Sequence, residues 1–276
     1  MFVHPDANSI TEALSQEVWE LAPELSRFVE FFEKIPFCWI QVVNCEISYT
    51  WLSRSPMALL QESGLVFPEL GLTLSELEVA SVMVQRHPVH AGMVRVSLNS
   101  SAHREQVLVD APAWAEEAIS ELSRNVARVH SSGEPPEGIE RVTRKLCDCC
   151  RERRSKIQQE GESHPLYRLL AVASASENGI RIDVEGELFC FSTRLYPLNY
   201  EQEDGKMVLG ASRSSLTLDL SEFFRAVARI DTIEEDRCSV IDCYNSYGDK
   251  LLSFSQRGDD LYELWSVMAK RAGSEG

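Results

Sequence analysis

Two segments of this chain carry the same pattern of residues, and this pattern constrains the fold more than any other feature. LTLSELEVA, which begins at Leu72, aligns without gaps with LDLSEFFRA, which begins at Leu218; both contain Leu-x-Leu-Ser-Glu. The elements predicted around the two segments follow one order, which is typical of an internal duplication. A chain of 276 residues is long enough for two domains. We therefore expect two structurally repeated halves.

The first half is predicted to consist of a helix, strands and a second helix. Apolar residues recur at helical spacing behind a capping-box pair that begins at Ser9, so one helix is expected from there to Pro36. Residues 38–52 and 93–109 are rich in alternating, β-branched and aromatic residues and predict strands. A second helix is expected to open at Pro112 and to extend to Val126.

The second half repeats this order. Residues 179–192 and 238–255 each predict two strands joined by a Gly-containing turn, and residues 260–268 predict a helix with an apolar stripe. We therefore predict an α+β fold in which each half is a mainly antiparallel sheet with flanking helices.

The segment HSSGEPPEGIE (130–140) marks the expected division between the halves. It is rich in Gly, Pro and Ser and is acidic, which is typical of a linker. The sequence therefore predicts a first repeat half over residues 1–130, a linker and connecting helix over 131–160, and a second repeat half over 161–276.

Charge and composition limit the partners that the chain can have. The formal net charge is −16 and the isoelectric point is near 4.9, which argues against nucleic acid or an anionic membrane as the main partner. No apolar run approaches the roughly 18 residues of a membrane span, and the first residues do not resemble a secretory signal. We therefore expect a cytoplasmic protein whose eight cysteines are reduced.

Three stretches resemble heme-utilisation and hemin-degrading factors. LSELEVASVMVQRHPVHAGMVRVSLNS (74–100) is similar to a strand-turn-strand element of that family, and CYNSYGDKLLSFSQRGDDLYELWSVM (243–268) is similar to its C-terminal element. SHPLYRLL (163–170) resembles the family's THxFxxLL, whose His coordinates heme iron, and places His164 at the matching position. The family's arginine-bearing element has Ser75-Glu76 and Ser221-Glu222 in the two copies here.

The resemblance implies the heme-utilisation fold and the binding of heme or a related tetrapyrrole, for trafficking or storage. It makes His164 the iron ligand, since a neutral imidazole on the first turn of a helix can offer a ring nitrogen to iron. Arg86 and His87 would contact the propionates, Arg257 would have a similar role in the second half, and Tyr167 would flank the ring. The alternative for His164 is a solvent-facing residue in the first helical turn, and for Arg86 and His87 it is a polar hairpin loop.

The sequence does not favour an enzyme. It contains no GxSxG, P-loop, GxGxxG or HExxH motif. Heme breakdown, which the resemblance also allows, is less favoured than binding. The rival function is a non-catalytic scaffold or regulatory protein that keeps the fold without the cofactor. In that hypothesis a sheet face or the basic segment 141–156 contacts an acidic partner or a second copy in a homodimer.

Three cysteines cluster in KLCDCCRERR (145–154), at positions 147, 149 and 150. Structural zinc usually needs four ligands, and the sequence has no second CxxC or HxxxH to complete such a site. On a helix Cys147 and Cys150 would share one face while Cys149 would point elsewhere. The favoured interpretation is a connecting helix, with a metal or redox site as the alternative.

Overall fold

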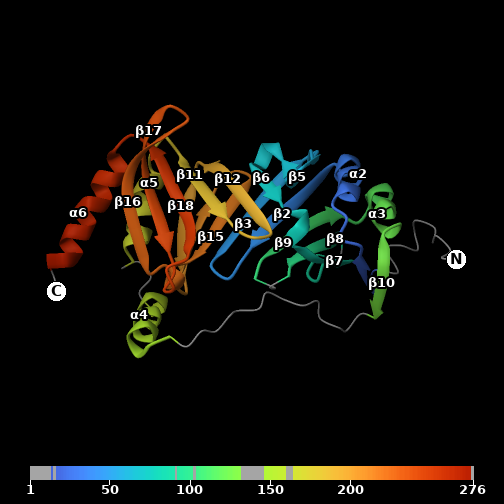
Figure 1. Ribbon diagram of the computed structural model, residues 1–276, viewed down its shortest axis with the longest axis horizontal. Coiled ribbons are helices and arrows are strands. Elements are labelled where there is room, and N and C mark those ends of the chain that lie inside the picture. The colour runs from blue at the N-terminus through green and yellow to red at the C-terminus, as the bar shows by residue number, and fades with distance from the viewer. Residues whose placement is uncertain are drawn as a thin grey trace. The chain divides into compact units, whose positions relative to one another are not determined.

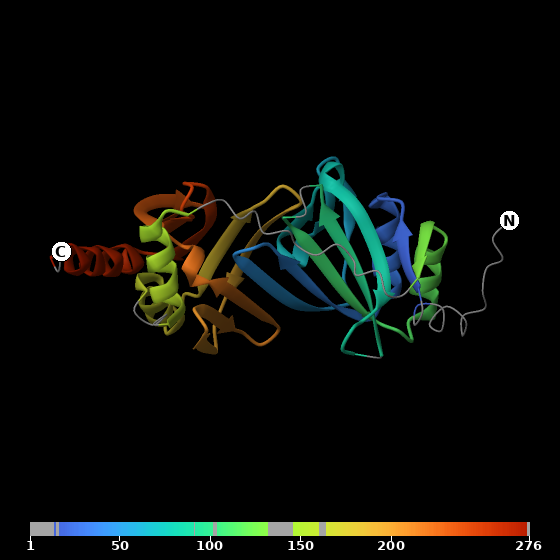
Figure 2. The same cartoon turned by 90° about the horizontal axis from the view of Figure 1, so that it is seen from below.

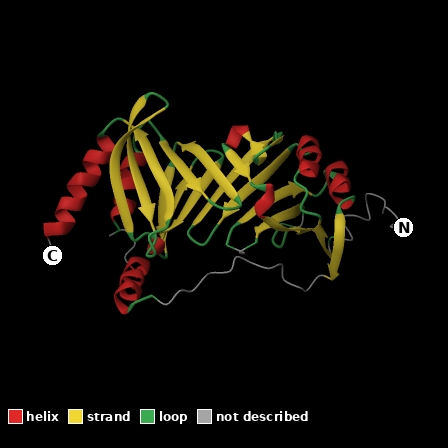
Figure 3. Cartoon of the chain, viewed as in Figure 1, coloured by secondary structure: helices red, strands yellow, loops and turns green. Residues whose placement is uncertain are grey.

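The computed structural model describes residues 14, 17–90, 92–101, 104–131, 146–159 and 164–274. It separates into two compact units. The first unit comprises Met1–Cys45, Thr50–Val142 and Gly186–Cys190, and the second comprises Glu46–Tyr49, Thr143–Glu185 and Phe191–Gly276. Strands outnumber helices in the described part of each unit (Figure 3).

In the first unit, the strand near the start of the described residues pairs with the strand that ends at residue 131. The elements of this unit are β1 (Glu17–Leu21), α2 (Ser26–Lys34), β2 (Phe37–Val43), most of β3 (Ile47–Arg54), β4 (Leu59–Gln61), β5 (Gly64–Phe67), β6 (Leu72–Leu74), β7 (Val79–Arg86), β8 (Met93–Ser100), β9 (Gln106–Pro112), α3 (Glu116–Ser123) and β10 (Val126–Ser131). Short 3-10 turns lie at Pro68–Leu70 and Glu76–Glu78.

The second unit begins, in its described part, with two helices. Its elements are α4 (Asp148–Gln159), α5 (Pro165–Ser174), β11 (Ile180–Glu185), most of β12 (Phe189–Leu195), β13 (Asn199–Glu203), β14 (Lys206–Gly210), β15 (Ser214–Asp219), β16 (Arg225–Ile233), β17 (Asp236–Tyr244), β18 (Lys250–Arg257) and α6 (Asp260–Ser274). A 3-10 turn at Leu220–Glu222 precedes β16. Helix α6 packs along β16 and β17 and against α5 (Figure 1).

The element orders confirm the predicted α+β fold of two repeated halves. The series from α2 through β2–β9 to α3 is matched, element for element, by the series from α5 through β11–β18 to α6. The aligned segments lie at equivalent places: each runs from the end of a strand through a 3-10 turn into the next strand, β6 to β7 in one half and β15 to β16 in the other.

In each unit the strands pair in one long and one short antiparallel series. In the first unit the series are β10-β1-β7-β8-β9-β2-β3 and β4-β5-β6. In the second unit the orders are β16-β17-β18-β11-β12 and β13-β14-β15. Two strands pass from one unit into the other: Glu46–Tyr49 places the start of β3 in the second unit, and Gly186–Cys190 places the start of β12 in the first.

The helix predicted from Ser9 to Pro36 is wrong over its described first part. Residues Glu17–Leu21 form strand β1, which pairs with β10 on one side and with β7 on the other. The adjacent residues Val18 and Trp19 point to opposite faces of β1 and are both buried. A short run that is apolar on both faces cannot be distinguished from part of a helical stripe by periodicity alone. Only Ser26–Lys34 are helical, and Ile35 is extended before Pro36, as expected before a proline. Ser9 lies outside the described residues.

The other predicted elements are found with adjusted ends. Residues 38–52 and 93–109 contain β2, β3, β8 and β9, and the second half contains β11, β12, β17, β18 and α6 where they are expected. The helix predicted after Pro112 stops at Ser123, and Val126 begins β10. In the described part of the chain, no helix is both long enough and apolar enough to span a membrane.

Helices α2 and α3 lie side by side in the first unit (Figure 2). The stripe of α2 consists of Phe28, Phe31 and Phe32, all at most 2% exposed. The Phe32 ring meets Phe31 and Phe67 edge to face, with centroids 5.2 and 4.8 Å away. Buried aromatic side chains of this kind contribute about 3–5 kcal/mol each.

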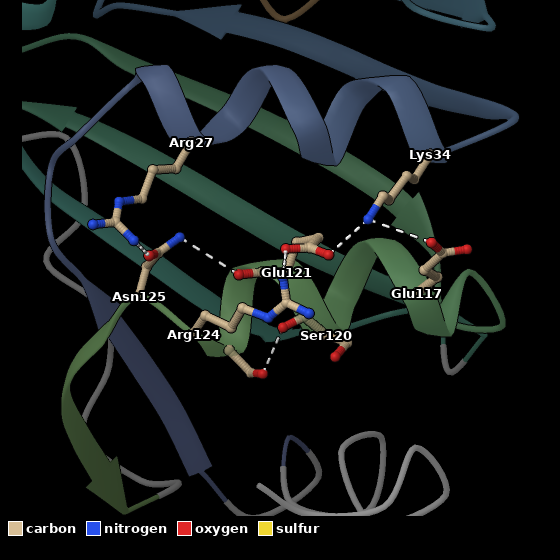
Figure 4. Close-up of polar contacts among 8 residues, drawn as sticks. Arg27, Lys34, Glu117, Ser120, Glu121, Arg124 and Asn125 are labelled. Atoms are coloured by element: carbon tan, nitrogen blue, oxygen red, sulfur yellow. Dashed lines mark hydrogen bonds and ion pairs between the residues drawn. The ribbon is translucent and has the colours of Figure 1, made fainter.

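Hydrogen bonds and ion pairs between side chains link α2 to α3 and to the residues just after it (Figure 4). The Lys34 amine donates to the Glu121 carboxylate at 2.6 Å and lies 3.4 Å from that of Glu117. At the other end of α2, Arg27 donates to the Asn125 side chain at 2.5 Å. The hydrogen bond from Lys34 lowers the pKa of Glu121 below its usual value.

Candidate functional site

His164 caps the N-terminus of α5. It is extended (φ −67°, ψ 129°), and its Nδ1 accepts the backbone N–H of Leu166 at 3.2 Å, while Pro165 occupies the first helical position. Capping of this kind satisfies a backbone N–H that has no partner within the helix. The residue is 6% exposed, so the solvent-facing alternative is wrong.

The second ring nitrogen of His164 is also bonded. Nε2 lies 3.1 Å from the Phe223 carbonyl oxygen, in the turn that leads from β15 to β16. Since Nδ1 accepts, the proton resides on Nε2, which donates to Phe223. Burial lowers the pKa of His164 to about 4; the hydrogen bond to Phe223 opposes this shift and the charge of Arg153 adds to it. The imidazole is therefore neutral at pH 7.

A cavity of about 320 Å³ opens beside His164 within the second unit. Its walls come from α4, α5, the turn before β16, the start of β16, and α6. They are Arg153, His164, Pro165, Leu166, Phe223, Phe224, Arg225, Ala226, Trp265 and Met268. The Arg153 guanidinium lies over the Phe224 ring at 5.1 Å from its centroid, which favours the cation by a cation–π contact. The walls suit a flat apolar ligand that carries anionic groups.

Tyr167 and Arg257 share the second unit with His164 but do not line this cavity. Tyr167 meets Tyr200 edge to face, with centroids 6.1 Å apart. Arg257, at the end of β18, is exposed and forms an ion pair with Asp236 at 3.0 Å. It borders a separate small recess.

Arg86 and His87 belong to the first unit, where β7 ends. Arg86 is exposed, whereas His87 is 9% exposed. Nδ1 of His87 accepts the backbone N–H groups of Val89 and His90 at 3.1 and 2.9 Å, so this side chain organises the turn into β8.

The other side of the His87 ring meets a buried ion pair. Arg95 donates to both oxygens of Asp110, at 2.7 and 2.8 Å, and Nε2 of His87 lies 3.4 Å from the same carboxylate. Burial lowers the pKa of His87, against the opposing influence of Asp110. In the structure as described, His87 is thus a neutral structural side chain.

The residues that complete the His164 cavity were not identified from the sequence. The sequence pattern marks Arg153 only as part of a basic helix. It marks Phe224 only as an apolar position of the repeat, and Trp265 only as an apolar position of a helix. The turn that meets His164 is 59 residues away in the chain at Phe223. Nothing in a local pattern reveals that approach. The repeated segment LDLSEFFRA, which contains Phe223, was the one available signal.

Comparisons with known proteins agree on the fold. No family model matches the chain, and no curated protein sequence matches it. Among solved structures, holo-PhuS, a heme-binding protein from Pseudomonas aeruginosa, matches with a TM-score of 0.66 at 10% identity, over 93% of this chain and 88% of PhuS. ChuS, described as an E. coli heme oxygenase, matches with a TM-score of 0.65 at 13% identity, over 96% of this chain and 91% of ChuS.

A second ChuS structure, described as the Escherichia coli O157:H7 heme degrading enzyme, gives a TM-score of 0.65 at 12% identity, over 92% of this chain and 85% of ChuS. At such low identity, structural likeness establishes the fold and leaves the chemistry to the site. The resemblance seen in the sequence is confirmed at this level: the chain has the heme-utilisation fold of PhuS and ChuS.

Proposed function

We propose that this protein binds heme or a related tetrapyrrole, for trafficking or storage, in the second-unit cavity beside His164. The observation that carries the proposal is a neutral imidazole in the wall of an otherwise aromatic and apolar cavity that two arginines border. The fold likeness to proteins described as heme-binding and heme-degrading supports it.

The cavity residues fit the chemistry of such a ligand. Phe223, Phe224 and Trp265 offer apolar and aromatic surface for the ring. Arg153 and Arg225 lie at the same cavity and can form charge-assisted hydrogen bonds with propionates. The volume of about 320 Å³ is at the small end of ligand pockets, which span about 300–1,000 Å³, so a whole tetrapyrrole would extend beyond it.

Iron ligation by His164 requires the ring to exchange one of its two hydrogen bonds. With the proton on Nε2, the lone pair that can bind iron is on Nδ1. Ligation through Nδ1 releases the backbone N–H of Leu166, which costs about 1–3 kcal/mol, and keeps the hydrogen bond from Nε2 to Phe223. Because the pKa of His164 is about 4, no second proton competes with iron for Nδ1 at pH 7. We therefore assign ligation to Nδ1 of His164.

The proposal places the propionate contacts at Arg153 and Arg225 rather than at Arg86, His87 or Arg257. Arg86, His87 and Arg257 do not line this cavity. Both ring nitrogens of His87 already have polar partners. Tyr167 lies one turn along α5 from His164 and supports the helix rather than the ring.

A hemin titration tests the proposal. Purified full-length protein should shift and sharpen the Soret band of hemin at one equivalent per chain. His164→Asn keeps a side-chain acceptor for Leu166 but removes the imidazole, and it should abolish the ligand-dependent band while the protein stays folded. His90→Asn, which alters an exposed histidine of the first unit, is the matched control and should behave like the wild type.

Two results would overturn the assignment. A Soret shift that is equal in His164→Asn and wild type would place the iron elsewhere. No shift in the wild type would remove tetrapyrrole binding altogether. A third observable separates binding from breakdown: bound hemin should keep its spectrum when ascorbate is added, because we propose a carrier and not an enzyme.

The second candidate function is a scaffold or regulatory protein that keeps the fold without the cofactor. One observation favours it: both ring nitrogens of His164 already have partners, so helix capping explains the residue without a metal. Under this hypothesis the protein does not shift the Soret band of hemin, and it elutes as a dimer or with a protein partner in size-exclusion chromatography.

A further inference from the structure

Three thiols converge at the start of α4, which differs from the arrangement that helical spacing predicts. Helix α4 begins only at Asp148, so Cys147 lies before it and its carbonyl accepts the N–H of Arg151 at 3.0 Å. Freed from helical geometry, Cys147 turns its Sγ to 2.7 Å from that of Cys149. The expectation that Cys149 points away is therefore wrong.

The Sγ atoms of Cys147, Cys149 and Cys150 all lie within 4.8 Å of one another. Sulfur ligands lie about 2.3 Å from a bound zinc ion, so two sulfurs that bind one ion lie within about twice that distance of each other. The separation of these Sγ atoms is of that size. Cys147 and Cys149 are exposed and Cys150 is half-buried, which leaves the cluster open to an ion from solvent. We propose that these three thiolates bind one soft metal ion, Cu(I) or Zn(II).

The other described cysteines do not share these properties. Cys38 and Cys243 are fully buried in strands, and burial raises the pKa of both thiols. Cys190 is exposed but belongs to no such cluster among the described residues. Within the described ranges no carboxylate or imidazole joins the three thiols. Three thiolates satisfy Cu(I), whereas Zn(II) would need water as a fourth ligand.

A disulfide is the competing chemistry of clustered thiols. It would join two of the three sulfurs and would transfer two electrons to an oxidant. Metal binding uses all three and needs only the loss of their protons. The cluster is also separate from the His164 cavity, so the two proposals fail independently.

Metal titrations under anaerobic conditions, with full-length protein reduced by a phosphine, test the site. One arm uses Cu(I) competed against a chromophoric Cu(I) chelator, and the other uses Zn(II) against a zinc-responsive dye. Wild type should bind one equivalent in at least one arm. Loss of an outer-shell partner typically weakens metal binding about 10–100-fold, so loss of a sulfur ligand in Cys149→Ser should weaken it by at least that factor.

Cys190→Ser is the matched control, because it removes an exposed thiol outside the cluster and should leave the affinity unchanged. Both variants should keep the wild-type circular dichroism and the wild-type response to hemin. Absence of a bound equivalent in both arms would overturn the proposal. So would a loss in Cys190→Ser equal to that in Cys149→Ser, since this would show unspecific thiol binding.

Discussion

The protonation of His164 should lower the free energy of unfolding of the second unit at acid pH, and the structure indicates by how much. In the unfolded chain this imidazole has its usual pKa of 6.5, whereas burial lowers its pKa in the folded chain to about 4. Between those values the unfolded state binds more protons, so the free energy of unfolding falls as the pH falls. At about 1.4 kcal/mol per pH unit, the loss over this window is about 3 kcal/mol.

The assay compares wild type with His164→Asn by denaturant unfolding at several pH values from 7 to 4. At pH 7 the variant should be less stable by about 1–3 kcal/mol, because the Phe223 carbonyl loses its buried donor while the helix cap is kept. As the pH falls, wild type should lose about 3 kcal/mol more than the variant, since carboxylates titrate equally in both. Hydrogen exchange of the α5 amides locates the loss in the second unit.

Parallel stability curves for the two proteins would refute this reasoning. They would mean that His164 takes up its proton in the folded state as readily as in the unfolded chain. The burial of the imidazole and its hydrogen bonds through both ring nitrogens could not then be as described above.

Two further predictions concern the packing of the first unit. Phe32→Ala should lower the free energy of unfolding by about 3–5 kcal/mol in denaturant titrations, because it removes a buried ring that contacts Phe67; an equal effect from the exposed Val89→Ala would contradict this. Gly64→Ala should lower the melting temperature more than Gly248→Ala. Both glycines have positive φ, which costs about 1–3 kcal/mol for other residues, but a Cβ at Gly64 would also lie 1.9 Å from the Leu74 carbonyl oxygen, whereas Gly248 has open space.

Local patterns were enough to predict much of the fold. Strands β17 and β18 are short runs joined by a Gly-containing turn, so the nearest partner of each in the sequence is also its partner in the sheet. The duplication could be recognised because both copies of Leu-x-Leu-Ser-Glu form the same local structure, the end of a strand followed by a 3-10 turn that leads into the next strand. The resemblance to heme-utilisation proteins followed from the same elements.

The candidate site was predicted in part. His164 was singled out by the resemblance of SHPLYRLL to the family's THxFxxLL, whereas its capping role is seen only in the structure. Its burial and its bond to Phe223 could not be predicted, because they depend on the approach of a turn that belongs to another part of the fold. Arg86 and His87 were grouped by sequence, yet the structure exposes one and buries the other beside Asp110.

By itself, the sequence therefore determined the α+β class, the repeated order of elements and the position of one histidine at the start of a helix, since each of these is encoded over a few neighbouring residues. Only the tertiary structure decided that Glu17–Leu21 is a strand, that β3 and β12 each serve both units, and that three thiols converge before α4. These features depend on partners that are distant in sequence or on where a helix begins. Their free energy comes from pairing and burial that exist only once the chain has folded.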